Sequence, residues 1–352
     1  MIGEKWRAFW EDIQGHNLWY ILKKIVVHYI FFFKTYDKEI AKSARRRWGQ
    51  ILAFWVRTRI PGWKGTTNRA YDRELIVSLT SYPARIDAAV DAVRSLLLQN
   101  RKPNRILLWL ATEQFPNREA DCPKRLREAC RYGLEIRWCD DLRSYKKLIP
   151  ALEEFPEAVI VTTDDDVLYR RTMLQKLHDA YRSNPSCIWA HNVSTFIAER
   201  GELIGRVWMS YPETMWDWAL QRRSVRNMKE FGARPLLVNE AVGCYGVLYP
   251  PHVLHPDVLN RAQFSELCPT NDDIWFWLMA VRIGTKTCTP KDSYCFVSYV
   301  KGTQEQPEAL YHTNEGKGRF GEDFHRLLRL YPELKGILCD AFAEQIGSME
   351  SS

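Results

Sequence analysis

The chain has 352 residues, of which 46% are hydrophobic, 26% charged and 13% aromatic. This length and composition predict a folded globular protein of about two domains and exclude disordered and collagen-like chains. No apolar stretch reaches the ~18 residues of a membrane-spanning helix. The nine cysteines are scattered without a C-x-x-C pair, and no secretory signal pattern is present. We therefore expect a cytoplasmic protein with reduced thiols.

The net charge of +7 is concentrated at the N-terminus. Residues 1–70 hold 14 Lys/Arg and 5 Asp/Glu, hence +9, whereas the other 282 residues hold 36 Lys/Arg and 38 Asp/Glu, hence −2. On a helix over residues 18–46, the cations share one face, and aliphatic and aromatic residues occupy the opposite one. Such a helix suits an anionic membrane surface.

We therefore expect residues 1–60 to hold the protein on the inner face of the cell membrane. The alternative is an ordinary helix packed on its own domain with a solvated charged face. Nucleic acid is not expected as a partner, because the segment lacks glycine-aromatic and zinc-type binding motifs.

Strands and helices alternate from Glu74 onward. Short apolar runs predict strands over residues 75–79, 105–110, 134–139 and 158–163. Spaced apolar residues predict helices over residues 88–99, 123–132 and 145–152. This alternation predicts an α/β fold with a mainly parallel sheet covered by helices on both faces. Ligands bind such sheets at the carboxyl ends of the strands.

Three adjacent carboxylates, Asp164, Asp165 and Asp166, directly follow the fourth predicted strand. They repel one another, and a divalent cation such as Mg²⁺ or Mn²⁺ would remove that conflict. The alternative is that one aspartate caps the helix predicted over residues 173–181 while the others are solvated.

A second acidic pair, Asp272 and Asp273, precedes the apolar residues 274–281. Acids at this position commonly start a helix. Two carboxylates beside a bound diphosphate would also suit a general base. Between the two acidic sites, residues 242–251 form a glycine-punctuated stretch that we expect to be a strand.

Three segments together carry a family resemblance. IVSLTSYPARI, TTDDD and NDDIWFWLMAVRIGTK resemble a bacterial glycosyltransferase of the GT-A fold, similar to family 2. Residues 147–152 are similar to a segment of capsule and lipopolysaccharide-type transferases. The resemblance spans residues 74–300 and departs at Asp272, where Glu is more usual. It implies a GT-A domain over residues 71–300, between an N-terminal segment (1–70) and C-terminal loop and helices (301–352).

The resemblance implies a metal site of Mn²⁺ or Mg²⁺ on Asp166 and Asp164. His312 is the late candidate for completing that site, against the more common structural role of a lone histidine.

It also implies that the nucleotide-sugar donor binds at the ends of the first and fourth strands. The donor-binding candidates are Thr80, Ser81, Tyr82, Arg85, Lys147, Asp164 and Asp165. For Lys147 the alternative is a solvated helix lysine, and for Tyr82 a simple turn.

Asp273 is the implied catalytic base that deprotonates an acceptor hydroxyl, with Asp272 orienting the acceptor or taking the base role. The expected activity is metal-dependent, inverting transfer of a sugar to a glycan or glycolipid in bacterial surface polysaccharide synthesis.

Two other functions stay open from the sequence. A sugar-phosphate nucleotidyltransferase uses a similar sheet and acidic site, although the loop Thr80–Arg85 lacks the glycines typical of such enzymes. A non-enzymatic membrane-surface protein would use the acidic clusters only as helix caps.

Overall fold

The structure is a computed structural model that describes residues 38–199, 201–208, 234–291, 293, 297–304, 314 and 318–350. Backbone contacts divide the chain into two compact units, Met1–Leu52 and Ala53–Ser352. Helix α3 (Lys38–Arg57) crosses the division. Most of the membrane helix expected over residues 18–46 lies outside the described residues, as does His312. No described helix is long and apolar enough to span a bilayer.

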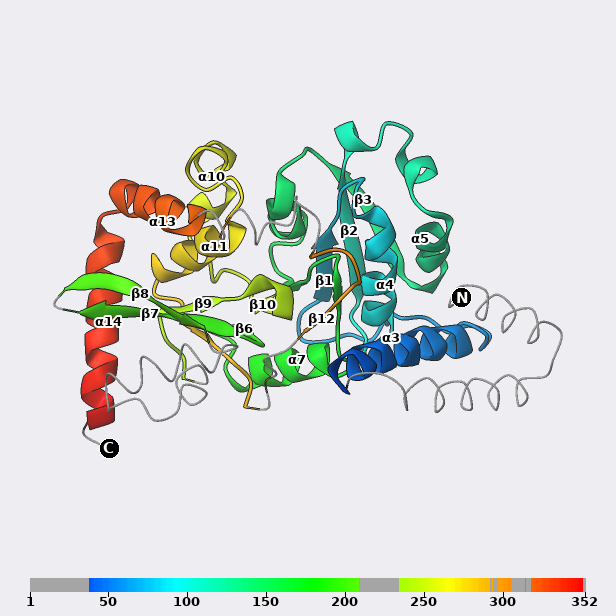
Figure 1. The fold of residues 1–352 in the computed structure, drawn as a ribbon, viewed down its shortest axis with the longest axis horizontal. Coiled ribbons are helices and arrows are strands. Elements are labelled where there is room, and N and C mark those ends of the chain that lie inside the picture. The colour runs from blue at the N-terminus through cyan, green and yellow to red at the C-terminus, as the bar shows by residue number, and fades with distance from the viewer. Residues whose placement is uncertain are drawn as a thin grey trace. The chain divides into compact units, whose positions relative to one another are not determined.

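In the described part of the second unit, seven strands form a central sheet in the order β11-β6-β10-β4-β1-β2-β3 (Figure 1). All neighbouring pairs are parallel except those that β10 makes with β4 and β6. The strands are β1 (Leu75–Thr80), β2 (Arg105–Ala111), β3 (Leu134–Cys139), β4 (Val159–Thr162), β6 (Ile188–Ala190), β10 (Val247–Tyr249) and β11 (Thr287–Cys288).

Alternation along the strands divides the core between the two faces of the sheet. On β1, Leu75, Val77 and Leu79 belong to one buried cluster, while Ile76 belongs to the other. This is the period of two that a strand buried on both faces requires.

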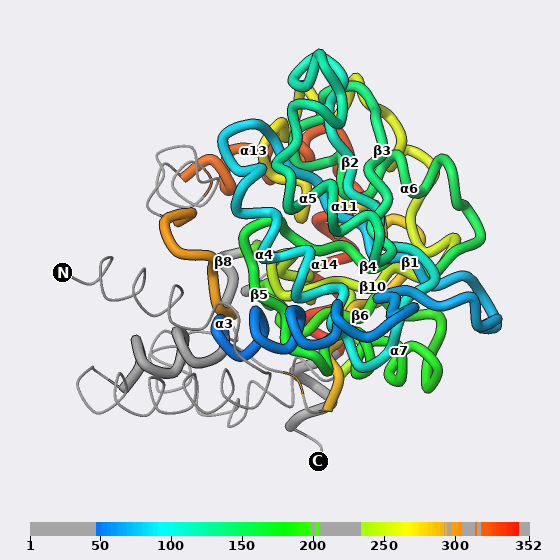
Figure 2. The backbone as a smooth tube through the Cα atoms, turned by 90° about the vertical axis from the view of Figure 1, so that its right-hand side faces the viewer, coloured from blue at the N-terminus to red at the C-terminus, as the bar shows by residue number. Residues whose placement is uncertain are grey.

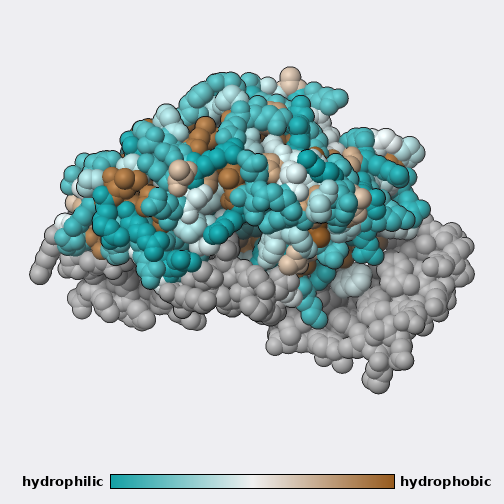
Figure 3. Space-filling view, turned by 90° about the horizontal axis from the view of Figure 1, so that it is seen from above, coloured by the Kyte–Doolittle hydropathy of each residue, from teal (hydrophilic) through white to brown (hydrophobic). Residues whose placement is uncertain are grey.

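Each face is covered by its own helices. The first cluster includes α4 (Ile86–Leu97), α5 (Lys124–Ala129) and α7 (Met173–Ser183). The second includes α6 (Ile149–Glu154), α10 (Arg261–Leu267), α11 (Asp272–Val281), α13 (Arg319–Leu330) and α14 (Glu333–Glu350). Figure 2 shows α4 and α5 beside β1–β3. The face in Figure 3 is mostly hydrophilic, with hydrophobic side chains in separate small patches.

Two small sheets flank the central one. Strands β7 (Val193–Glu199), β8 (Glu202–Trp208) and β9 (Asn239–Ala241) pair in the order β8-β7-β9. Strand β5 (Val167–Leu168), just after the acidic turn, pairs with β12 (Ser298–Tyr299). The second pairing brings residues near position 300 beside the acidic turn.

The predicted architecture is confirmed: the chain is α/β, with a mainly parallel sheet covered by helices on both faces. Two local expectations differ. Residues 242–251 are not one strand, because a short 3-10 turn (Gly243–Tyr245) separates β9 from β10. The helix expected over residues 145–152 is split into a 3-10 turn (Arg143–Lys147) and α6, which begins with Pro150 in its first turn.

Candidate functional site

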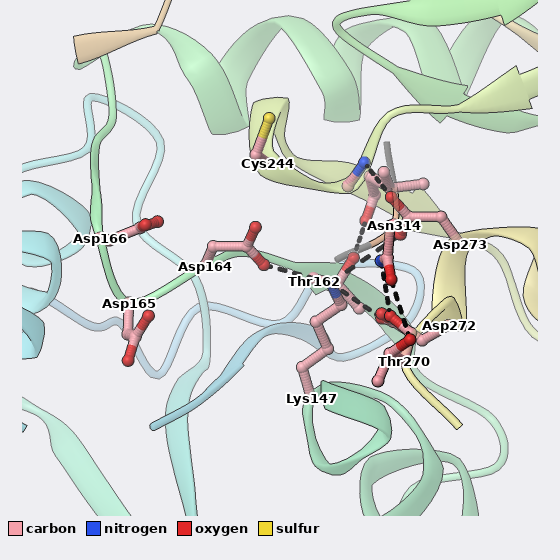
Figure 4. Close-up of polar contacts among 12 residues, drawn as sticks. Lys147, Thr162, Asp164, Asp165, Asp166, Cys244, Thr270, Asp272, Asp273 and Asn314 are labelled. Atoms are coloured by element: carbon pink, nitrogen blue, oxygen red, sulfur yellow. Dashed lines mark hydrogen bonds and ion pairs between the residues drawn. The ribbon is translucent and has the colours of Figure 1, made fainter. Parts of the chain in front are cut away.

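The two acidic segments meet at the carboxyl edge of the central sheet, joined by one lysine (Figure 4). The ammonium Nζ of Lys147 lies 3.1 Å from Asp164 Oδ1 and 2.9 Å from Asp272 Oδ2. It also lies 3.9 Å from Asp273 Oδ1. Asp164 follows β4, whereas the other two carboxylates begin α11. One cation therefore bridges carboxylates more than a hundred residues apart in the sequence.

Lys147 is only 5% exposed, so it is not a solvated helix lysine. Burial lowers the pKa of an ammonium, but Asp164, Asp272 and Asp273 together raise the pKa of Lys147 well above its usual value. The side chain therefore stays charged across the physiological pH range. Its burial among carboxylates gives the site a permanent positive centre.

Asp273 is held by backbone as well as by charge. The amide N–H of Gly243 donates to Asp273 Oδ2 at 2.9 Å. A Cβ at position 243 would lie 2.5 Å from Asp273 Oδ1, so any larger residue there would require the Asp273 carboxylate to move. The side chain keeps 36% of its surface exposed, although its carboxylate is surrounded by protein on the other sides. Burial, supported by repulsion from Asp272 and opposed by Lys147, raises the pKa of Asp273 to about 7.

Asp165 and Asp166 form a second acidic group with a different cation. Arg85 Nη1 lies 2.9 Å from Asp166 Oδ2 and 3.5 Å from Asp165 Oδ1. Ser81 donates to Asp165 Oδ2 at 2.5 Å, and Gln304 donates to Asp166 Oδ2 at 2.7 Å. Burial lowers the pKa of Arg85, but the charges of Asp166 and Asp165 raise it by more. The pKa of Arg85 therefore lies above its usual value. Both carboxylates therefore have protein partners, but burial and repulsion from Asp166 still raise the pKa of Asp165 to about 7, and burial and repulsion from Asp164 raise that of Asp166.

Asp164 is turned away from these two carboxylates. Figure 4 shows its side chain pointing toward Lys147, with Asp165 and Asp166 on the other side of the turn. Its backbone N–H donates to the Tyr169 hydroxyl at 2.8 Å, and that hydroxyl donates to the Cys244 carbonyl at 3.1 Å. These bonds fix the turn, so the divergence of Asp164 and Asp166 is built into the backbone.

Carboxylate oxygens such as those of Asp164 and Asp166 are ligands that a hard divalent cation prefers, but here they are not arranged as a metal site. Within the described ranges, no three His, Cys, Asp or Glu side chains are grouped so that they could hold a metal. Asp166 already contacts Arg85, and Asp164 already contacts Lys147. The residues as they lie do not fit the metal, and we assign no chemical step to it.

The predicted donor-binding residues at the end of β1 lie beside the acidic turn. Ser81 and Arg85 contact it directly, as described above. The Thr80 hydroxyl instead donates to the Trp109 carbonyl at 2.9 Å, on the neighbouring strand β2. The Tyr82 ring lies 5.9 Å from the Arg85 guanidinium.

The sequence also allowed the acidic residues to be helix caps, and the structure answers this differently for the two acidic segments. The residue capping α7 is Thr172, so none of the aspartates after β4 caps that helix. Asn271 does occupy the N-cap of α11, with Asp272 and Asp273 in its first turn. Its side chain makes no capping bond to the helix and donates to Asp323 Oδ2 instead.

Three contacts of the site were not predicted. Gln304 reaches Asp166 from 138 residues away, and no local pattern marks it. The Gly243 amide binds Asp273, for which the glycine itself was the only signal. Asn314 and Thr270 exchange two hydrogen bonds of 2.8 Å, which tie a C-terminal residue to the start of α11.

No protein-family model matches the chain, and no curated protein sequence matches it. A similar solved structure is the mannosyltransferase PcManGT from Pyrobaculum calidifontis in complex with GDP-Man and Mn²⁺. It is 13% identical over 89% of this chain and 84% of that chain, with a TM-score of 0.43.

Two nucleotide-dependent enzymes are also similar. CMP:2-keto-3-deoxy-manno-octonic acid synthetase complexed with CTP is 14% identical over 62% of this chain and 88% of that chain, with a TM-score of 0.34. The inositol-1-phosphate CTP transferase from T. maritima is 9% identical over 68% of this chain and 94% of that chain, with a TM-score of 0.36. These similarities concern the fold, so we base the function on the site itself.

Proposed function

We propose that the chain is a glycosyltransferase that moves a sugar from a nucleotide-diphosphate donor to a hydroxyl of a glycan or glycolipid. The observation that carries the proposal is the single cluster in which Lys147 joins Asp164 to Asp272 and Asp273. The cluster sets a carboxylate with a raised pKa beside a buried cation, at the sheet edge where α/β proteins bind ligands.

Asp273 is the proposed general base. The acceptor hydroxyl gives its proton to the Asp273 carboxylate while its oxygen attacks the anomeric carbon. A new carbon–oxygen bond forms, and the bond from the anomeric carbon to the diphosphate breaks, so that the electron pair leaves with the nucleoside diphosphate. A base with a pKa of about 7 is matched to proton transfer near neutral pH. Attack opposite the leaving group inverts the anomeric centre.

Negative charge develops on the departing diphosphate, and positive groups placed beforehand would stabilise it. Lys147 and Arg85 are the charged groups of the site that could supply this stabilisation. Asp272 would hold Lys147 in place or orient the acceptor. Ser81 and Asp165 would position the donor from the end of β1.

The role of Mn²⁺ or Mg²⁺ is also a proposal, with Asp166 and Asp164 as ligands. Binding there requires Arg85 to leave Asp166 and Asp164 to turn away from Lys147. Arg85→Gln should therefore raise the affinity for Mn²⁺ alone about tenfold, measured by calorimetry on the apoprotein. An unchanged affinity would show that the acidic turn is not the metal site. Arg101→Gln, which removes an arginine from a surface pair with Asp179, is the control.

The decisive experiment is calorimetric titration with a panel of nucleoside diphosphates, with and without Mn²⁺. One diphosphate should bind, and Asp273→Asn should bind it equally while losing transfer. Failure of every diphosphate to bind the folded protein would refute the proposed donor site. An active Asp273→Asn variant would move the base elsewhere.

Product analysis separates this reaction from that of a sugar-phosphate nucleotidyltransferase. Glycosyl transfer releases a nucleoside diphosphate, whereas nucleotidyl transfer from a nucleoside triphosphate releases pyrophosphate. The proposed setting is bacterial surface polysaccharide synthesis on the cytoplasmic face of the membrane, with residues 1–60 as the membrane contact. Deleting residues 1–52, which keeps the unit from Ala53 onward, tests that contact with anionic liposomes.

A further inference from the structure

A group of basic residues lies at the amino edge of the sheet, opposite the candidate site. Arg57 ends α3, Lys64 follows it, Lys102 precedes β2, and Arg171 follows β5. We call these four residues the amino-edge patch. Lys64 is exposed, and the other three are half-buried.

Backbone hydrogen bonds place the patch at the beginnings of the parallel strands. The amide of Thr67 donates to the Pro103 carbonyl at 2.9 Å, just before β2. Gly65 donates to the Tyr132 carbonyl at 2.7 Å, just before β3. Asn100 donates to the Arg171 carbonyl at 2.8 Å, which brings the fourth patch residue to the same edge.

The patch is not neutralised by the protein. Across the described part of the chain, no carboxylate lies within ion-pair distance of Arg57, Lys64, Lys102 or Arg171, whereas neighbouring Arg101 is paired with Asp179 at 2.7 Å. Lys102 and Lys64 donate only to backbone carbonyls, of Lys64 and Arg131 respectively. Burial and the nearby charge of Arg57 both lower the pKa of Lys102 and of Arg171. An external anion would relieve this repulsion.

Apolar groups accompany these cations. Ile60 is 54% exposed, in a turn formed by Ile60–Trp63 with a hydrogen bond of 3.2 Å. The ammonium of Lys102 lies 5.5 Å from the Trp63 ring, and the guanidinium of Arg59 lies 4.8 Å from the Trp55 ring. Cations beside tryptophan and a protruding isoleucine are the composition that a bilayer interface favours.

We propose that the amino-edge patch, together with the exposed Ile60 that follows Arg57, docks the unit from Ala53 onward on an anionic lipid bilayer. This surface belongs to the unit from Ala53 onward, and Arg57 and Ile60 are the part of it that falls within residues 1–60. Nucleic acid also attracts cations, but a protruding isoleucine gains nothing from a phosphate backbone. The inference does not depend on the reaction that the carboxyl edge performs.

The test compares two triple variants of the full chain in co-sedimentation with vesicles containing 30% phosphatidylserine at low salt. The patch variant is Lys64→Gln, Lys102→Gln and Arg171→Gln. The control is Lys286→Gln, Lys291→Gln and Arg329→Gln, which removes three exposed cations elsewhere and changes the net charge equally. At about 1 kcal/mol per cation near an anionic surface, the patch variant should lose roughly 100-fold in vesicle partitioning. The control should lose less than about fivefold.

Ile60→Ser leaves the net charge unchanged, so long-range electrostatics predicts no effect on vesicle binding. We expect this variant to lose vesicle partitioning several-fold. Thermal melting of each variant establishes that it is folded. Equal losses in the two triple variants, or wild-type binding by the patch variant, would overturn the proposal. So would an Ile60→Ser variant that binds vesicles normally. A patch variant that loses duplex DNA binding but keeps vesicle binding would assign the surface to nucleic acid instead.

Discussion

Asp273 combines a raised pKa with a partly open carboxylate, and this combination has a measurable consequence for pH dependence. A base must be unprotonated to accept a proton from the acceptor. Because the pKa of Asp273 is raised to about 7, it becomes half-protonated near neutral pH in the free enzyme.

We therefore expect kcat/KM for transfer to fall about tenfold per pH unit below about pH 7, and to level off above it. The measurement is a pH profile of initial rates at low donor and acceptor concentrations. Asp140→Asn, which changes an exposed aspartate paired with Arg261, should leave the profile unchanged. A wild-type profile that stays flat down to pH 5 would show that a different group carries the proton.

Lys147 should matter for stability as well as for activity. Replacing it with Met leaves three carboxylates close together without their cation, and breaking a buried charge pair in this way costs about 3–5 kcal/mol. The neighbouring Lys146 is also buried, but it contacts a single carboxylate, Asp141, at 2.5 Å.

Lys146→Met is therefore a matched control, and we expect it to lose less free energy of unfolding than Lys147→Met. Urea denaturation at pH 7.5 measures both. Equal losses would mean that the number of carboxylates around each lysine does not determine its contribution.

The 3-10 turn between β9 and β10 positions Asp273, the proposed base. Gly243 begins this turn, and its amide donates to Asp273, whose carboxylate a Cβ at position 243 would push aside. Gly243→Ala should displace the Asp273 carboxylate and lower kcat at least 100-fold, while donor binding remains.

Gly336→Ala is the matched substitution, because a Cβ there meets nothing within 4 Å. It lies within helix α14, where Ala is favoured over Gly by about 1 kcal/mol, so the variant should be active and slightly more stable. Transfer rates, diphosphate titration and thermal melting distinguish the two variants. Normal transfer by Gly243→Ala would show that the base tolerates movement.

The elements that sequence predicts well are those encoded by local pattern. Strands β1–β4 follow short apolar runs, and α4, α7 and α11 follow apolar residues at helical spacing. Strand β10 lies within the strand expected over residues 242–251, but its antiparallel direction was not predicted, because a run of three buried residues carries no information about direction. The break at Gly243–Tyr245 was missed for a similar reason, since the turn is determined by what packs against it.

The same distinction applies within the site. Adjacent aspartates after a strand are visible in the sequence, but their cations are not. Lys147 and Arg85 were predicted to bind the donor, whereas in the structure they contact Asp164 and Asp166. These pairings depend on how the sheet brings distant segments together, which no local spacing records.

At the scale of the whole molecule, the division after Leu52 determines where the chain can be shortened. Phe54 is 9% exposed, with its ring centroid 5.6 Å from that of Tyr132 and 6.1 Å from that of Trp63. A deletion that removes Phe54 therefore opens the core of the unit from Ala53 onward.

A chain beginning at Ala53 should melt within a few degrees of the full-length protein. A chain beginning at Pro61 should be destabilised by about 3 kcal/mol, the typical effect of losing a buried phenylalanine. Calorimetric melting of the two truncated chains makes the comparison. Identical melting temperatures would show that Phe54 contributes nothing to the stability of the unit. For liposome experiments, the chain that begins at Ala53 is the better control.

The distance between the amino and carboxyl edges of the sheet determines how far the candidate site lies from a surface on which the amino edge rests. Strand β1 is six residues long, which separates its two ends by about 20 Å. If the amino edge rests on lipid, Asp273 lies at roughly that distance above the headgroups. A first sugar attached directly to a membrane lipid would lie too close to the bilayer to reach it. The molecule would then act as a spacer that selects acceptors already several sugars long, and chain length would enter its specificity through geometry alone.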